Sequence, residues 1–164
     1  MAAKIPPGCQ RRFSFMDWPG YEAGAWQRLL EEAGQQQSIP DTIILGTDRD
    51  EGAVKLAHEN AERAGVAGWV QFSRRAVSSI EPLAQRGWVV TNPPYGVRIS
   101  QKQDLRNLYA QFGNVLRSRC PGWQVAFLCN EDRLATQTGL TFHPGISLIN
   151  GGIPVKLNRG IVPE

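Results

Sequence analysis

The sequence predicts an α/β fold, with a mostly parallel sheet covered by helices and an antiparallel hairpin near the C-terminal end. From residue 42 onward, short apolar runs alternate with segments whose apolar residues recur at helical spacing, which is typical of parallel βα units. The C-terminal part instead carries two extended runs joined by Asn150-Gly151-Gly152, and Asn-Gly is a strong hairpin signal.

Apolar runs rich in β-branched and aromatic residues predict the strands. Such runs are typical of parallel strands that are buried on both faces. The first run ends at Asp48-Arg49-Asp50, and the third ends at an Asn-Pro-Pro segment. The parallel strands are expected at residues 42–47, 69–72, 88–90 and 124–129, and the hairpin strands at 140–149 and 153–159.

Amphipathic spacing predicts the helices. One helix begins at Glu51, with Asp50 as its N-cap, and closes at Gly65. Further helices are expected near residues 22–34, 78–85, 105–116 and 132–136. We therefore expect one domain at 1–164, with an irregular and helical lead-in at 1–40 and a βα core at 41–164.

The composition indicates a globular chain. Its 164 residues are 41% hydrophobic, and no apolar run approaches the ~18 residues that cross a bilayer, so no membrane partner is expected. The N-terminal residues show no secretory signal, which makes the cytoplasm the expected location. Three scattered cysteines and two histidines predict no metal site, and a net charge of +3 permits an RNA partner without requiring one.

The strongest candidate site is Asn92-Pro93-Pro94-Tyr95, directly after a predicted strand. Parallel sheets bind ligands beyond the carboxyl ends of their strands. Methylation of an exocyclic base amine is difficult because the nitrogen lone pair is delocalised; Asn92 Oδ1 and a backbone carbonyl could accept both N–H groups and favour a nucleophilic nitrogen. The prolines stiffen the loop, and Tyr95 could stack on the base. Alternatively, Pro-Pro only ends the strand and Tyr95 packs against the sheet.

A second candidate site follows the first predicted strand. The Asp48 carboxylate could accept both ribose hydroxyls of a nucleoside cofactor, whereas Asp50 is expected to cap the next helix. Acidic residues occupy this place in nicotinamide-binding domains too, so the signal gains its weight from the pairing with Asn92. His58 is expected to be half-buried packing, and the Asn150 turn, explained by hairpin geometry, could border the substrate site. Arginines that could face RNA are Arg74, Arg75, Arg98, Arg106, Arg117 and Arg119.

These segments resemble the class I S-adenosylmethionine-dependent RNA methyltransferases that often carry a THUMP domain, and most closely the bacterial 23S rRNA guanine-N2 methyltransferases. The resemblance covers nearly the whole chain. It rests on Gly46-Thr47-Asp48-Arg49-Asp50, on Thr91-Asn92-Pro93-Pro94-Tyr95-Gly96, on Asn150-Gly151-Gly152-Ile153-Pro154-Val155 and on the early segment Ile5-Pro6-Pro7-Gly8.

The resemblance implies a Rossmann-like methyltransferase fold, S-adenosyl-L-methionine as cofactor and RNA as partner. Asp48 would hold the cofactor ribose and Arg49 would lie beside the adenine. Ala76 stands where the family usually has an Asp that bonds the adenine amine. The implied catalytic residues are Asn92, Pro93, Pro94 and Tyr95, and the implied cofactor-binding residues are Asp48, Arg49, Ala76 and Asn92.

One departure from the family is large. The family's first strand and Gly-rich turn, which cradle the methionine part of the cofactor, are missing before Met1. We expect a fragment or a misassigned start, weak cofactor binding by this chain alone, and an upstream THUMP domain as a possibility. A DNA adenine-N6 methyltransferase and a non-catalytic module that binds RNA or a partner stay open as alternatives; a nicotinamide-dependent enzyme ranks last.

Overall fold

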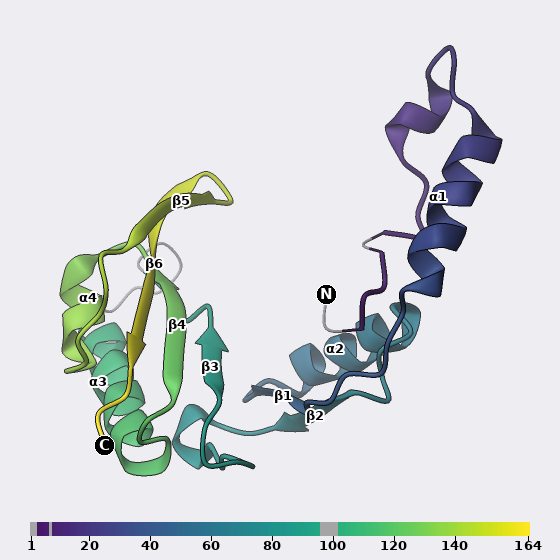
Figure 1. Cartoon of the computed structure of the whole chain (residues 1–164). Helices are drawn as coiled ribbons and strands as arrows, with labels where there is room; N and C mark the ends of the chain where they lie inside the picture. Colours follow the sequence, from purple (N-terminus) through teal and green to yellow (C-terminus); the bar gives the residue numbers. More distant parts are fainter. Residues whose placement is uncertain (1–2, 7, 96–101) are drawn as a thin grey trace. The chain divides into compact units, whose positions relative to one another are not determined.

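The computed structural model describes residues 3–6, 8–95 and 102–164 and contains two compact units, Met1–Arg74 and Arg75–Glu164 (Figure 1). The first unit holds η1 (Ser14–Asp17), α1 (Ala23–Gln35), β1 (Ile44–Asp48), α2 (Glu51–Arg63) and β2 (Val70–Arg74). The second holds η2 (Val77–Ser79), β3 (Trp88–Thr91), α3 (Lys102–Arg119), β4 (Gln124–Cys129), α4 (Asp132–Gln137), β5 (Ile146–Asn150) and β6 (Ile153–Ile161).

The first unit contains a βαβ element. Strands β1 and β2 pair in parallel, with Gly46 opposite Phe72, and α2 connects them. A Cβ at position 46 would lie 2.5 Å from Cδ1 of Phe72, so any residue other than glycine would force the Phe72 ring to move. The ring of His58, an exposed residue of α2, meets the Phe72 ring edge-on with centroids 5.1 Å apart, so this histidine packs at the surface.

Aromatic side chains hold the lead-in to this unit together. Trp26 of α1 contacts Phe13 and Phe15 edge-on, with centroid distances of 5.9 and 5.2 Å. Tyr21 meets Phe15 at 6.0 Å, and Arg12 forms an ion pair with Asp17. Because no residue of α1 is fully buried, this aromatic cluster anchors the helix.

The second unit is a four-stranded sheet in the order β3-β4-β6-β5. β3 and β4 are parallel, whereas β6 runs antiparallel to both β4 and β5. Helices α3 and α4 pack on one face, where Phe127 of β4 is 1% exposed and meets the rings of Tyr109, Phe112 and Phe142. This face contains most of the hydrophobic core of the chain.

The predicted elements match the structure closely, with three differences. The first hairpin strand, expected at 140–149, is shorter, because β5 begins only at Ile146, after Pro144 and Gly145. The stretch at 78–85 forms only the single turn η2, because it has too few apolar residues to make a helix that packs. The mostly parallel sheet is observed only in part: each unit contains its own sheet, and the described strands form two parallel and two antiparallel pairings. Among the described strands, β1 pairs only with β2 and β3 only with β4, so each keeps one unpaired edge.

The side chains of β3 alternate between a packed and an uncovered face of the sheet. Val90 is 73% exposed and Trp88 is 54% exposed, although Val89 between them packs against the core. Within the described ranges, no helix is long and apolar enough to cross a membrane.

Candidate active site

The loop after β3 presents Asn92 at the carboxyl edge of the sheet of the second unit. β3 is held against β4 from the pair Trp88–Gln124 to the pair Thr91–Phe127, so the strand that carries the loop is fixed up to the residue before Asn92. Asn92 is exposed, Pro93 is half-buried and Pro94 is exposed. The amide of Asn92 is therefore accessible from a stiff backbone, as its expected chemistry requires.

A side-chain hydrogen bond ties this loop to the C-terminal hairpin. Asn150 Nδ2 donates to Tyr95 Oη at 2.6 Å, across 55 residues of sequence, and both residues are half-buried. The Tyr95 hydroxyl is therefore engaged with the hairpin. The sequence analysis explains Asn150 by the hairpin turn and therefore does not predict this contact.

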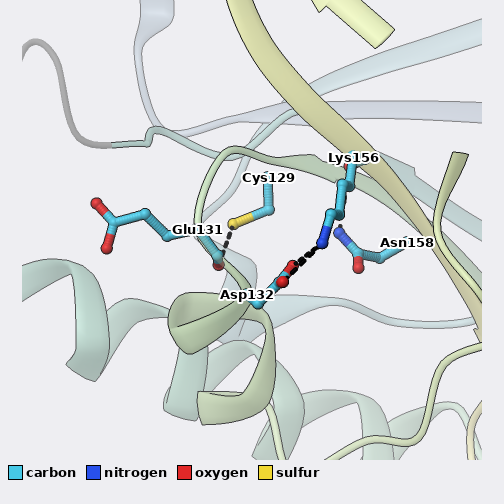
Figure 2. A network of polar contacts seen from close by, with 5 residues as sticks. All are labelled: Cys129, Glu131, Asp132, Lys156 and Asn158. Carbon is cyan, nitrogen blue, oxygen red and sulfur yellow. Dashed lines mark hydrogen bonds and ion pairs between the residues drawn. The ribbon is translucent and has the colours of Figure 1, made fainter. Parts of the chain in front are cut away.

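A second polar network lies at the end of β4 (Figure 2). Lys156 of β6, opposite Cys129, donates to both carboxylate oxygens of Asp132, at 2.8 and 2.6 Å. Asn158 Nδ2 donates to the Lys156 carbonyl at 3.2 Å, and Cys129 Sγ donates to the Glu131 carbonyl at 3.2 Å. These contacts join the start of α4 to the stem of the hairpin that carries Asn150.

Two buried polar groups lie in this unit without a hydrogen-bond partner among the described residues: the Tyr109 hydroxyl and Asn130 Oδ1. Tyr109 is 1% exposed, and burial, with a smaller contribution from Cys129, raises the pKa of its phenol well above the ordinary value. Tyr109 is therefore neutral at physiological pH and cannot act there as a base.

The acidic residues after β1 have different roles in the first unit. The Asp50 backbone N–H donates to Asp48 Oδ1 at 2.8 Å, which orients the exposed Asp48 carboxylate at the end of the strand. The Asp50 side chain accepts from the Ala53 N–H at 3.0 Å and caps α2, which confirms the predicted cap. Arg49 contributes its carbonyl, which accepts from Arg74 Nε at 3.1 Å.

Ala76 belongs to the second unit, where it precedes η2. Its carbonyl accepts from the Ser79 N–H at 2.9 Å, and the residue is exposed. It shares that unit with Asn92, whereas Asp48 and Arg49 belong to the other. Because its side chain is a methyl group, only its backbone could form a polar contact with a ligand.

Several arginines of the predicted RNA-facing patch form contacts within the protein. Arg75 pairs with Glu81 at 2.6 Å and lowers the pKa of that carboxyl. Arg117 donates to the Thr138 carbonyl and to Asn114 Oδ1, and Arg74 lies 3.7 Å from Glu51. Arg98 lies outside the described residues. Over the described ranges, no group of His, Cys, Asp and Glu side chains could hold a metal ion.

Solved structures define the class of this fold. SMU.472, assigned as a methyltransferase and crystallised with SAH, matches with a TM-score of 0.86 at 26% identity, over 96% of this chain and 42% of that one. A Listeria monocytogenes protein described as a predicted N6-adenine-specific DNA methylase matches with a TM-score of 0.79 at 26% identity, over 96% of this chain and 40% of that one. The chain thus has an α/β methyltransferase-like fold.

The family is also defined. The model of the RMKL-like methyltransferase domain, UPF0020, matches residues 1–147, and the chain belongs to this family. The ribosomal RNA large subunit methyltransferase K/L of Shewanella baltica strain OS155 is 36% identical over 163 residues, which cover 96% of this chain and 23% of that protein. The chain therefore spans about a quarter of the length of the curated relatives it matches. The family resemblance seen in the sequence is confirmed.

Proposed function

We propose that this chain supplies the acceptor-amine site of an S-adenosylmethionine-dependent RNA methyltransferase that acts on N2 of guanine in large-subunit rRNA. The observation that carries the proposal is the exposed Asn92 at the carboxyl edge of β3, followed by two prolines and by a tyrosine bonded to the hairpin. The similarity to the ribosomal RNA large subunit methyltransferases K/L of Shewanella supports the choice of rRNA.

The loop residues have separate tasks in this proposal. Asn92 Oδ1 accepts one N–H of the target amine, and a backbone carbonyl of the loop accepts the other, which leaves the nitrogen lone pair directed away from the ring. Pro93 and Pro94 hold these acceptors in place, since neither can rotate about φ or offer a competing N–H. The Tyr95 ring stacks on the base, which must leave its helix to reach the edge of the sheet.

The cofactor would contact the residues after β1. S-adenosylmethionine, when bound, supplies a methyl group on a positively charged sulfur. Asp48 fits the ribose end, because one of its oxygens is fixed by the Asp50 N–H and the exposed carboxylate has acceptor capacity left for hydroxyl groups. Arg49 would lie beside the adenine, and Ala76 would contribute its backbone.

Methyl transfer to defined substrates tests the proposal. The full-length gene product is incubated with labelled S-adenosylmethionine and unmodified rRNA, and the modified nucleoside is identified by mass spectrometry. N2-methylguanosine is the expected product. If the protein methylates neither rRNA nor DNA under conditions in which it binds the cofactor, the proposal is wrong.

The ribose contact has a matched control. Asp48→Asn should weaken cofactor binding in calorimetry by about tenfold, because it removes a charged acceptor. Asp50→Asn should leave binding nearly unchanged, since Asn caps helices as well as Asp does. An unaltered dissociation constant for Asp48→Asn would exclude the contact.

A DNA adenine-N6 methyltransferase is the second candidate. The similar Listeria structure is described as such an enzyme, and the Asn92 loop suits an adenine amine by the same chemistry. The same assay separates the two, because N6-methyladenine formed in DNA with no modification of rRNA would favour this candidate.

A further inference from the structure

The topology of the second unit brings the C-terminal hairpin to the edge that carries Asn92. β6 runs antiparallel to β4, and β5 runs antiparallel to β6, so β5 points in the same direction as β3 and β4. The last residue of β5, Asn150, therefore lies at the same edge of the sheet as the loop after β3. This placement follows from strand direction and does not depend on the length of the loop.

Hairpin geometry does not account for the identity of Asn150. In this turn, Gly151 and Gly152 have positive φ angles of +57° and +81°, as both central residues of a type I′ hairpin turn require. Asn150 lies before the turn and pairs with Ile153 across the hairpin. Asparagine is disfavoured in strands, so a different reason is needed for this side chain.

The contact with Tyr95 provides that reason. The 2.6 Å bond uses the amide as donor and the phenol oxygen as acceptor, so the Tyr95 O–H proton is left to donate elsewhere. The bond holds the hydroxyl end of the Tyr95 ring, and the backbone after Pro94 holds the Cβ end. The tyrosine ring is thereby held at both ends within a half-buried contact.

We propose that Asn150 is a positioning residue of the methyl-acceptor site, which sets the orientation of the Tyr95 ring against which the target base stacks. This inference rests on the proposed function of the Asn92 loop. The β5–β6 hairpin is then a wall of the base-binding site, and the Lys156–Asp132 pair secures its stem to α4.

A double-mutant cycle tests the inference. Asn150→Ala removes the donor, and Tyr95→Phe removes the acceptor but keeps the ring. Each should lower kcat/KM for rRNA by about tenfold, mainly through KM, because a hydrogen bond that orients the ring is lost while Asn92 is untouched. The double variant should be no worse than either single variant, since both changes remove the same bond.

Two further variants separate positioning from damage to the fold. Asn150→Asp can keep the bond in reverse, with the tyrosine donating, and should recover part of the activity. Ser147→Ala, an exposed change on the same strand, should behave as the unmodified protein. A Ser147→Ala variant as impaired as Asn150→Ala would overturn the inference, because any disturbance of β5 would then suffice.

A readout that does not require turnover makes the test independent of the reaction. In protein labelled with ¹³C at tyrosine Cζ, the Tyr95 signal, identified by its loss in Tyr95→Phe, should shift in Asn150→Ala and stay in place in Ser147→Ala. If the Tyr95 signal does not shift in Asn150→Ala, or if the losses of kcat/KM in the double-mutant cycle simply multiply, the role of Asn150 is wrong. The proposed function would still stand in that case, provided that the unmodified protein methylates rRNA. Absence of methylation by the unmodified protein would instead contradict the proposed function.

Discussion

The two units fix polar side chains at strand ends by different means. In Met1–Arg74, Asp48 and Asp50 bond to backbone groups two and three residues away. In Arg75–Glu164, Tyr95 of the loop after β3 bonds to Asn150 of β5, which is 55 positions away in the sequence. The positions of Asp48 and Asp50 therefore depend only on the turn between β1 and α2, whereas the contact between Tyr95 and Asn150 depends on the whole four-stranded sheet. A change in the core of the second unit should accordingly disturb the contact between Tyr95 and Asn150 before it disturbs the contacts of Asp48 and Asp50.

The distribution of the core sharpens this contrast. Among the described residues, the buried apolar side chains of the first unit are only Ala3 and Ala61. The core of the second unit instead centres on Phe127, between α3, α4 and the sheet. Stability should therefore respond most strongly to changes in the second unit.

The largest expected effect comes from Phe127→Ala. This change empties the space between Tyr109, Phe112 and Phe142, and loss of a buried Phe costs about 3–5 kcal/mol. Chemical denaturation followed by far-ultraviolet circular dichroism measures the loss. Phe13→Ala in the aromatic cluster of the first unit serves as the comparison; an equal loss there would contradict the proposed difference between the cores.

Cysteine reactivity should divide the units in the same way. Cys120 and Cys129 are buried in the second unit, and Cys9 is half-buried in the first. Burial raises the pKa of the Cys120 thiol. At a given pH, a smaller fraction of Cys120 than of an exposed cysteine is therefore present as the reactive thiolate. Iodoacetamide at pH 8, followed by peptide mass spectrometry, should modify Cys9 at least about tenfold faster than Cys120. Equal rates would show that the second core opens readily.

The helix cap gives a smaller and local effect. Asp50→Ala should weaken α2 by about 1 kcal/mol, because the Ala53 N–H loses its acceptor. Amide hydrogen exchange in α2 reports this loss, and exchange in α3 should not change. Asp50→Asn keeps a good cap, and equal losses in the two variants would mean that the charge acts in place of the hydrogen bond.

The smallest effect is expected for Lys156→Ala. Its ion pair with Asp132 joins side chains that are 46% and 69% exposed, and such pairs contribute less than about 1 kcal/mol. The difference in the free energy of unfolding should shrink further in 1 M salt, since screening weakens exposed pairs. A larger loss that persists in high salt would indicate that the pair supports the hairpin more strongly than its exposure suggests.

The success of sequence reasoning followed the same division between local and distant contacts. The strand at 124–129 and the cap at Asp50 were predicted because period, propensity and capping depend on residues close in sequence. The separation into two sheets and the bond between Tyr95 and Asn150 were not, because they depend on which strands meet in space. The turn alone does not require Asn150, because the two glycines after it supply the positive φ angles.

The most direct measurement is methyl transfer to rRNA by an Asn92→Ala variant of the full-length gene product. We expect a loss of at least about a hundredfold in kcat, because the variant lacks the acceptor at the reacting nitrogen. The dissociation constant for S-adenosylmethionine should stay nearly unchanged. Undiminished methylation by a variant that still binds the cofactor would contradict the role of this loop.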